Sequence, residues 1–444
     1  MAADPKAPYI TAFQNRIARV EPRWLRERRQ GAIDSFDRLG FPTLKHEEWK
    51  YTNVGPITRT SFTLSASAGA APVPQEVLDR LYVRHTATDQ LVFVDGHHVR
   101  ALSPRGPSPQ GMRVESLAWT LEHTPEALEP HLGRGGSFDD HAFAALNDAF
   151  FTDGAYIHVP RGITATPLVH LLFLSTGEGS RAAFPRNVIV AEAGSHLSVL
   201  ETYVGLGTGA SLTDVSTQIA VGEGAAVNHY KMQAEGDATF HVATTEGLQA
   251  RGSFLGDHQI ALGGAIARND IRARFEGEGA ELAMNGLYVL RGGQHTDFHT
   301  RIDHAVPQCT SLELYRGILD GRSRGIFNGK VFVREGAQKT VAKQTNKNLL
   351  LSEEALVDST PGLEIRADDV KCSHGSSIGQ LDEDAMFYLR SRGMDEFRAR
   401  AVLTHAFAVD ILAAVKLAPL RARLHEVVLS HLPGGDELRD AVGV

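Results

Sequence analysis

The sequence predicts a mainly β protein with a β-solenoid core, flanked by an α-helical N-terminal region and an α-helical C-terminal domain. Three observations predict this class. From about residue 151, glycine and β-branched residues become frequent and helical periodicity fades. Short segments within that stretch recur at a nearly constant interval. Apolar residues follow helical spacing before residue 40 and after residue 380. The expected divisions of the chain are 1–150, 151–370 and 371–444.

Composition and charge exclude several classes of protein. The chain has 444 residues and a formal net charge of −8, whereas nucleic-acid-binding proteins need a concentrated basic surface. No apolar run approaches the roughly 20 residues that cross a bilayer, and the N-terminus lacks the features of a secretory signal. Two cysteines are too few for a disulfide framework. We therefore expect a cytoplasmic protein that contacts neither nucleic acid nor membrane.

The N-terminal region is expected to combine helices with short ordered pieces. Apolar residues at helical spacing predict helix over 10–39. The motif KHEEWKYTNV, residues 45–54, predicts a surface loop anchored by aromatic side chains. Small and Pro-rich residues 65–76 predict a linker. The dipeptide Asp95-Gly96 between two apolar runs predicts a hairpin.

The central repeat is defined by a small or turn-forming residue at the start of each unit. Aligned on that residue, successive anchors lie 30, 28, 27, 28 and 29 residues apart. The position three residues later is apolar in four units and becomes Thr310 and Lys339 in the last two. Because one coil buries little and a stack buries a continuous core, the period favours a solenoid over its main rival, a two-sheet sandwich. The anchors are Gly194, Gly224, Gly252, Gly279, Pro307 and Gly336.

The C-terminal stretch predicts helices that follow the solenoid. Asp382 suits an N-cap, and Gly393 suits the residue after a helix end. The next segment places Phe397, Ala408 and Leu412 on one apolar stripe. A solenoid end exposes unpaired strand edges, so these helices are expected to cap the stack, to bind a partner, or both.

Motifs for self-contained catalysis are weak or missing. No G-x-x-x-x-G-K-[ST] occurs, so the chain is not expected to hydrolyse ATP itself. Residues 375–379, GSSIG, match the spacing of a nucleophile elbow around Ser377, but polar residues precede them and the helix starts only later. QHTDFHTRIDH is the most metal-like segment. On a strand its His295 and His299 share one face while His304 takes the other, which suits a single tetrahedral site poorly.

The two cysteines receive different interpretations. Cys309 is expected to be a small buried apolar residue. Cys372 and His374 lie two residues apart, so in an extended segment both side chains face the same way. Together they offer two of about four metal ligands, or a thiol whose pKa a neighbouring imidazolium would lower, or ordinary packing. Two ligands on one chain imply that a second chain supplies the rest.

Several motifs resemble the SufB/SufD family of iron–sulfur cluster assembly proteins. DVKCSHGSSIGQLDEDAMFYLRSRGM is similar to the C-terminal signature of its SufD members, and KHEEWKYTNV to their N-terminal motif. RIDHAVPQCTSLELYRGIL and QTNKNLLLS resemble the family core, and THAFAVDIL its C-terminal helix. SufB members depart from the KCSHG pattern, so the resemblance favours SufD.

The resemblance implies a right-handed parallel β-helix whose core pairs with SufB and whose C-terminal helices bind the ATPase SufC. It implies a non-enzymatic scaffold subunit with no tightly bound cofactor on the isolated chain. The SufB–SufD interface would then hold a transient iron–sulfur cluster or iron. His374 would be a metal ligand that this chain shares with the partner chain, and Cys372 is the weaker candidate. Arg390, Arg392 and Gly393 are the expected SufC contacts.

Three questions stay open at this point. A β-helix hydrolase acting on polysaccharide would need paired carboxylates in a groove along the solenoid. A purely structural subunit that stabilises SufB would use Cys372 and His374 only for packing. The sequence also leaves open whether the isolated chain forms a homodimer through its partner-facing surface.

Overall fold

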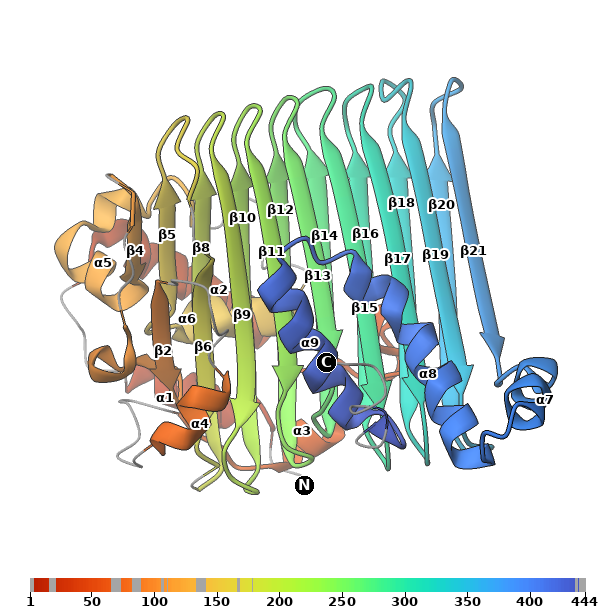
Figure 1. Ribbon diagram of the computed structural model, residues 1–444. Helices are drawn as coiled ribbons and strands as arrows, with labels where there is room; N and C mark the ends of the chain where they lie inside the picture. The colour runs from red at the N-terminus through yellow and green to blue at the C-terminus, as the bar shows by residue number, and fades with distance from the viewer. Residues whose placement is uncertain are drawn as a thin grey trace.

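The predicted β-solenoid with helices at both ends of the chain is confirmed. The computed structural model describes residues 4–15, 21–64, 73–81, 89–104, 108–109, 111–132, 141–165, 168–177, 179–435 and 438. Long parallel strands alternate between two stacked sheets, so that each coil gives one strand to each sheet (Figure 1). This connectivity excludes the two-sheet sandwich, whose strands are antiparallel.

The first sheet, sheet A, has 11 strands, and its main path runs β20-β18-β16-β14-β12-β10-β8-β5-β4. The bounds are β4 Arg113–Ser116, β5 Ala155–Val159, β8 Arg186–Ala191, β10 Ser211–Val221, β12 Thr239–Gln249, β14 Ile266–Phe275, β16 His295–His304, β18 Arg324–Val333 and β20 Leu356–Ile365, with β1 Thr63–Leu64 and β7 Arg181–Ala183 beside this path.

The second sheet, sheet B, has 10 strands in the order β21-β19-β17-β15-β13-β11-β9-β6-β2-β3. The bounds are β2 Gln90–Val94, β3 His97–His98, β6 Val169–Ser175, β9 His196–Gly205, β11 Ala226–Ala234, β13 Phe254–Ala261, β15 Glu281–Leu290, β17 Thr310–Leu319, β19 Val341–Leu350 and β21 Lys371–Gly379. The predicted hairpin at Asp95-Gly96 is confirmed, because it joins the antiparallel pair β2 and β3.

The space between the two sheets holds the main core. Alternate residues of each strand point inward, and in successive coils the same register position repeats as a row. Such rows explain how a chain with one strand pair per coil builds a continuous apolar interior. Regular β structure continues to Gly379, beyond the expected division at residue 370.

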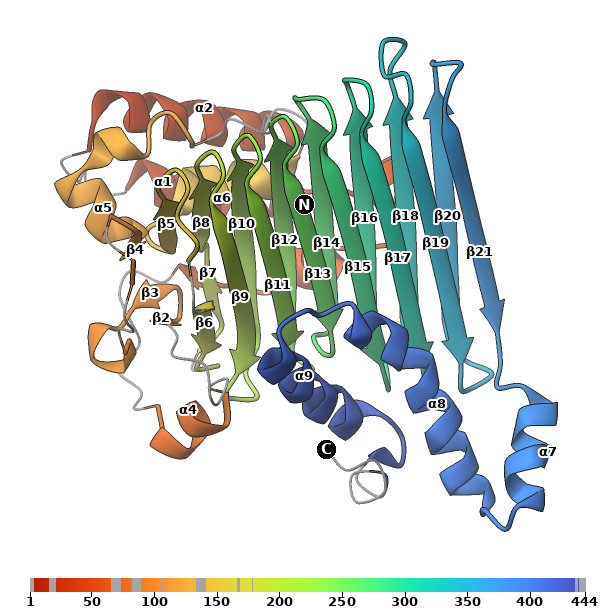
Figure 2. The same cartoon turned by 45° about the horizontal axis from the view of Figure 1, so that its top comes forward.

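Helices cover the outer faces of both sheets. Most of those of the N-terminal region cover sheet A, where Phe36 and Phe143 pack against Phe240 and Ile266. Figure 2 shows this helical layer and the C-terminal helices on opposite sides of the solenoid. The bounds are α1 Ala7–Gln14, α2 Arg23–Leu39, α3 Gly55–Arg59, α4 Gln75–Leu81, α5 Leu117–His123 and α6 Ala142–Phe150, with the 3-10 turns η1 Glu47–Trp49, η2 Arg100–Leu102 and η3 Pro125–Ala127. Helix α4 differs from the layer on sheet A and packs through Leu78 on β2 and β6 of sheet B.

Two N-terminal predictions need refinement. Helix is present over most of 10–39, but it comes as α1 and α2, and residues 16–20 between them lie outside the described part of the chain. The expected linker at 65–76 is only partly testable, because 65–72 are also outside that part. Its last two residues already belong to α4.

The C-terminal helices are α7 Glu383–Ser391, α8 Glu396–Ala413 and α9 Ala418–His431. Ala408 and Leu412 of α8 pack on sheet B, as the apolar stripe predicted, whereas Phe397 is half exposed. Asp382 caps α7 by accepting a hydrogen bond from the backbone N–H of Ala385, which confirms the predicted start. Among the described residues, no helix is both long and apolar enough to cross a membrane.

The predicted repeat is correct in four coils and shifted in the last two. Gly194, Gly224, Gly252 and Gly279 all have positive φ at the corner before a sheet B strand. The pairing of Thr310 with Glu281 and of Val341 with Thr310 makes Gln308 and Lys339 the equivalent corners. These lie one and three residues beyond the expected anchors. Three residues after the true corners lie Ser311 and Ala342, both buried, so the inward row does not decay.

Candidate functional site at the open end of the solenoid

The last coil leaves both sheets with an unpaired edge. β20 ends sheet A and β21 ends sheet B, and each pairs with only one strand among the described residues, β18 and β19 respectively. An edge strand presents a row of free N–H and C=O groups that can pair with another chain. At the other end of the stack the sheets finish in shorter strands, β4 with 4 residues and β3 with 2, and β2 beside β3 is buried along its whole length. Only the end formed by β20 and β21 presents long, exposed strand edges among the described residues, and we call it the open end.

Register places both residues of the Cys-x-His motif in rows that point into the solenoid. Cys372 follows Ala342 and Ser311, and His374 follows Gln344, in the parallel ladder of sheet B. Ala342 and Gln344 are each only 1% exposed. His374 is exposed because no further coil covers it. The expectation that the two side chains of the motif share a face is confirmed.

Cys372 behaves as the last member of an apolar row. Its side chain is partly buried and packs against the main core. Burial raises the pKa of its thiol. The conditional expectation of a thiol made more acidic by a nearby imidazolium is therefore not met, and the nucleophile hypothesis loses its physical basis.

His374 lies at the mouth of the solenoid interior, where β20 faces β21. A hydrogen bond from Ser376 Oγ to Ser359 Oγ, 2.8 Å long, joins the two strands across this mouth. Two inward positions at the mouth are apolar but uncovered: Ile365 is 41% exposed and Ile378 49%. The mouth thus combines an imidazole, hydroxyl groups and exposed apolar surface between two strand edges.

Polar residues continue directly beneath His374. Gln344 Nε2 donates a hydrogen bond of 2.6 Å to Glu313 Oε2, one coil further in. Burial raises the pKa of the Glu313 carboxyl to about 7. These side chains give His374 a polar floor, whereas Cys372 has the apolar Ala342 beneath it.

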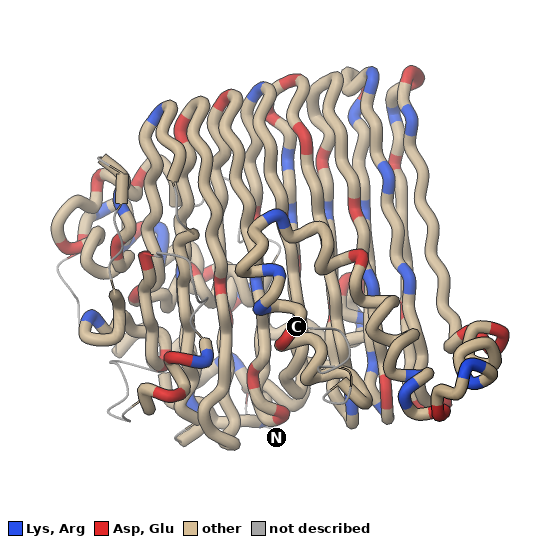
Figure 3. The backbone as a smooth tube through the Cα atoms, viewed as in Figure 1, with Lys and Arg blue, Asp and Glu red and all other residues tan. Residues whose placement is uncertain are grey.

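The expected SufC-contact residues lie on the surface of the first C-terminal helix. None of the residues of α7 is buried, and Figure 2 shows this helix standing beyond the end of the solenoid. Arg390 forms a long ion pair of 3.8 Å with Glu396, and Arg392 lies over the ring of Tyr388. Gly393 has φ +91° and ends the helix. Both signs of charge mark α7 in Figure 3.

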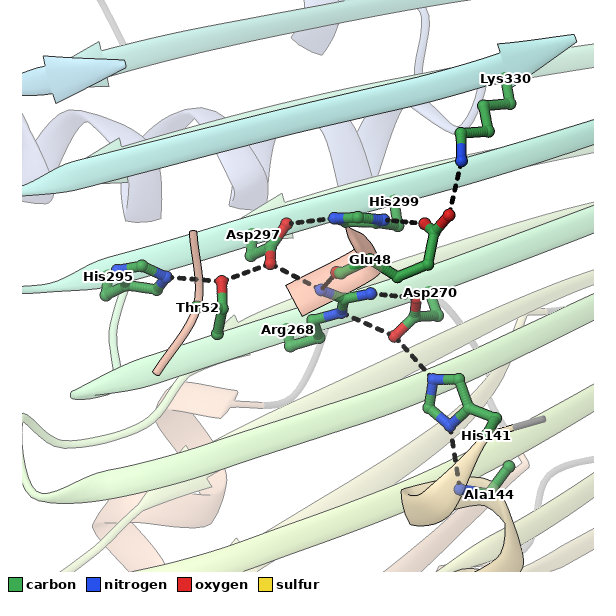
Figure 4. Close-up of polar contacts among 10 residues, drawn as sticks. All are labelled: Glu48, Thr52, His141, Ala144, Arg268, Asp270, His295, Asp297, His299 and Lys330. Carbon is green, nitrogen blue, oxygen red and sulfur yellow. Dashed lines mark hydrogen bonds and ion pairs between the residues drawn. The ribbon is translucent and has the colours of Figure 1, made fainter. Parts of the chain in front are cut away.

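The metal-like segment QHTDFHTRIDH forms a hydrogen-bonded network instead of a ligand cluster. His295 and His299 lie on the outer face of β16 and His304 lies inside, bonded to Ser311, as the alternation predicted. In Figure 4, Thr52 links His295 to Asp297, and His299 lies between Asp297 and Glu48. In the parts of the chain that the structure describes, no group of three His, Cys, Asp or Glu residues is arranged to hold a metal ion.

The remaining cysteine and the elbow-like serine occupy structural positions. Cys309 is fully buried in the main core, as predicted for a small apolar residue. Ser377 lies in the middle of β21, not at a turn from strand to helix. An elbow needs that strained turn to present its hydroxyl.

The sequence did not predict that the N-terminal segment takes part in this network on the outer face of sheet A, which we call the outer network. Glu48 and Thr52 come from the loop at 45–54 and reach β16 across more than 240 positions of sequence. Arg268 on β14 completes the network with hydrogen bonds of 2.8 Å to Asp270 and to Asp297. The aromatic anchoring of the loop was predicted and is confirmed by the buried Trp49. No feature of the sequence at 45–54 indicates the polar contacts that this loop makes.

Comparison with known families gives two matches that together span most of the chain. Residues 173–407 match the model of the SUF system FeS cluster assembly SufBD core domain. Residues 5–171 match that of the SufBD protein N-terminal region. The boundary between them falls inside β6, within the first coils of the stack.

Similar proteins occur in bacteria and in a plant. An iron–sulfur cluster assembly SufBD family protein of Synechocystis is 31% identical over 94% of this chain and 93% of the relative. The iron–sulfur cluster assembly protein SufD of Escherichia coli is 31% identical over 90% of this chain and 91% of the relative. The chloroplastic protein ABCI7 of Arabidopsis thaliana is 27% identical over 83% and 80%.

Proposed function

Because this chain belongs to the SufBD family, we propose that it is a non-catalytic subunit of a SUF iron–sulfur cluster assembly scaffold. In this proposal its open end pairs with a SufB-type chain, and its C-terminal helices bind a SufC-type ATPase. Iron or a nascent cluster is transient cargo at the junction of the two solenoids. His374 supplies one ligand there, and the partner supplies the others.

The observation that carries this proposal is the position of His374. It is exposed at the mouth of the solenoid, between two strand edges that have no partner in the described chain. A second solenoid that continued both sheets would pair these edges and cover Ile365 and Ile378. It would also enclose His374, and an enclosed imidazole is a good ligand for iron.

The proposed contact with the ATPase is supported by apolar residues on α7 and α8. Phe387 is 75% exposed, and Tyr388 and Phe397 are each at least half exposed. Aromatic side chains of this kind are enriched among the residues that dominate binding energy at interfaces. Arg390 and Arg392 flank them and supply charge around an apolar centre.

The test replaces His374 by alanine in the co-expressed complex and measures anaerobic cluster reconstitution by absorbance and iron content. We expect the complex to assemble normally and cluster yield to fall by about tenfold or more, since loss of metal-site residues typically costs 10–100-fold. Ser373→Ala is the matched control, because Ser373 is exposed on the opposite face of the same strand. An unchanged yield in His374→Ala would remove the site from this proposal.

A purely structural subunit is the second candidate, and the packing of Cys372 favours it for that residue. Cys372→Ala reproduces the residue at the equivalent position of the preceding coil, Ala342. We expect this variant to keep most of the cluster yield. If the double variant with His374→Ala also keeps it, the subunit acts by structure alone.

The ATPase contact is tested with Phe387→Ala and Tyr388→Ala, because both side chains are exposed and α7 should keep its fold without them. We expect pull-down of the SufC-type subunit to weaken by about tenfold for the stronger of the two. Arg390→Ala and Arg392→Ala should have smaller effects. Leu312→Ala is the control, a half-exposed apolar residue on β17. Equal loss in the control would place the contact elsewhere.

A further inference from the structure

Gln344 carries a buried amide oxygen that lacks a hydrogen-bond partner. It lies on β19, directly beneath His374 in the parallel ladder of sheet B, and its side chain points into the solenoid. Its Nε2 donates a hydrogen bond of 2.6 Å to Glu313 Oε2, one coil further in. Its Oε1 is buried and accepts no hydrogen bond from any described residue. A buried acceptor without a donor costs free energy, so a reason for this amide is needed.

The side chains of the last coil cover Gln344. It is only 1% exposed, although β19 is one strand away from the open edge. Neighbouring strands lie about 4.8 Å apart, and His374 is the residue of β21 that pairs with Gln344. Side chains paired on one face at this spacing can form a hydrogen bond. Among the described residues none bonds to the His374 ring, so both of its nitrogens are available.

Glu313 and Gly329 fix the direction in which the amide points. A carboxylate only accepts hydrogen bonds, so the amide turns its NH2 group toward Glu313 and its carbonyl away from it. Gly329 lies across the interior on β18 and leaves the space that the amide fills, because a Cβ there would clash with Gln344 Nε2. With its NH2 group held at the inner coil, the amide leaves its carbonyl on the side of the last coil, where His374 lies.

The neighbouring inward row contains an amide that is satisfied within the chain. Asn346 lies two residues further along β19, beneath Ser376, and is fully buried. Its Oδ1 accepts hydrogen bonds of 2.6 Å from Asn348 and 2.7 Å from Ser359. Burial in this part of the solenoid therefore does not by itself leave an amide oxygen unpaired. The unpaired oxygen occurs in the row that ends in His374.

A metal-binding imidazole needs the kind of acceptor that Gln344 offers. A histidine that binds a metal through one ring nitrogen almost always donates the N–H of the other nitrogen to an oxygen acceptor. That hydrogen bond fixes the tautomer and the orientation of the ring. Gln344 Oε1 is an acceptor without a donor, and His374 is a ring without an acceptor.

We propose that Gln344 is the positioning residue of His374. When a partner chain encloses the mouth, Gln344 Oε1 accepts a hydrogen bond from one ring nitrogen of His374, and the other ring nitrogen is left to bind iron. Glu313 holds the amide in the required direction from the coil below. This role rests on the proposed function of His374 as a ligand.

The experiment measures the affinity of the co-expressed complex for Co²⁺ alone, by visible absorbance at pH 8. Burial raises the pKa of the Glu313 carboxyl to about 7, so this group is ionised at pH 8. Gln344→Met removes the acceptor at similar volume and should weaken Co²⁺ binding by about tenfold or more, since loss of residues that orient a metal ligand typically costs 10–100-fold. Combining Glu313→Gln with Gln344→Glu should restore the affinity, because an acceptor oxygen again faces His374.

Asn346→Leu is the matched control, because it removes a buried amide from the same strand but from the next row. Urea denaturation measures how far each variant weakens the fold. Affinity that falls in Gln344→Met, returns in the exchanged pair and persists in Asn346→Leu supports the positioning role. Equal losses in Gln344→Met and Asn346→Leu, no loss in Gln344→Met, or no recovery in the exchanged pair overturns it.

His374→Ala separates this role from the proposed function. If His374→Ala lowers the Co²⁺ affinity and Gln344→Met does not, His374 remains a ligand and only the positioning role is overturned. If His374→Ala leaves the affinity unchanged, His374 is not a ligand, and both the proposed function of this residue and the positioning role are overturned.

Discussion

Single buried charges set how the stability of this protein depends on pH. His229 lies between Asp257 and Glu201, at 2.6 and 3.2 Å, in the fully buried interior. Burial lowers the pKa of His229, but the bonds to these two carboxylates outweigh burial and raise it to about 9. Burial also lowers the pKa of His299 in the outer network, but Asp297 and Glu48 outweigh burial and raise it to about 9. Both are thus protonated in the folded chain at pH values where the unfolded chain has lost the proton.

The sign of the effect follows from linkage. A folded pKa above the unfolded value of about 6.5 gives stability that is complete below pH 6.5 and is lost as pH rises toward 9. Above pH 8, Lys231 opposes the loss, because burial lowers its pKa to about 8. Between pH 6.5 and 8 the two histidines therefore dominate the change, and Glu313, whose pKa burial raises to about 7, adds a smaller loss of the same sign.

We predict that the free energy of unfolding falls by about 1–2 kcal/mol for each of the two histidines across that window. Urea denaturation at several pH values measures it. His229→Gln and His299→Gln should each remove part of the slope, whereas His196→Gln, an exposed histidine of β9, should leave it intact. A slope that neither variant changes would contradict the assignment.

Arg268 is the residue on which the outer network depends most. It is 1% exposed and bonds to two carboxylates and to the backbone of Glu48. Removing it leaves buried negative charge without a partner, so Arg268→Ala should lower the free energy of unfolding by about 3–5 kcal/mol. Denaturation together with limited proteolysis near residues 40–52 measures this. Arg272→Ala, a neighbour on the same strand that is less buried, should cost far less, and equal costs would contradict the argument.

At the scale of elements, the corners of the coils determine the backbone geometry. Gly224 has φ +61° with open space where a Cβ would lie, so Gly224→Ala should lower the free energy of unfolding by roughly 1 kcal/mol through the backbone alone. Gln308 occupies the same kind of corner with φ 62°. Gln308→Gly should therefore raise the free energy of unfolding by up to about 1 kcal/mol. Thermal melts of the two variants should shift in opposite directions, and a shift in the same direction would contradict this equivalence.

These corners also explain what the sequence could predict about the fold. The period was visible because four corners use glycine, a residue type that marks positive φ. Gln308 and Lys339 take the same conformation without that mark, so the alignment slipped in the last two coils and Thr310 was placed in an inward row. Ser311 holds that inward position instead, as the strand register shows.

The candidate sites show the same division between features that local sequence spacing predicts and features that depend on the three-dimensional arrangement. Cys372 and His374 were placed on one face because two-residue spacing fixes that in any strand. Their difference in burial could not be predicted, since it depends on which coil is the last. The contact of Glu48 with His299 and Lys330 joins distant segments and carries no local signal.

At the scale of the whole molecule, the solenoid is asymmetric because, among the described residues, only the end formed by β20 and β21 presents long and exposed strand edges. The mouth around Ile378 exposes apolar side chains and two strand edges, and edges of this kind pair with other chains. Without the proposed SufB-type partner, two copies of this chain present the same surface to each other. A symmetric dimer through that surface would satisfy both edges.

We predict that the isolated chain self-associates through its open end and that Ile378→Lys prevents it. Ile378 is 49% exposed, so the lysine should be tolerated in the monomer while its charge opposes burial in the dimer. Sedimentation velocity across a concentration series measures the effect, and circular dichroism establishes that the fold is kept. Leu312→Lys is the control, because Leu312 is 50% exposed on β17, away from the mouth. If Leu312→Lys disrupts the dimer and Ile378→Lys does not, the association uses the side of the solenoid, and the open end is left for a different chain.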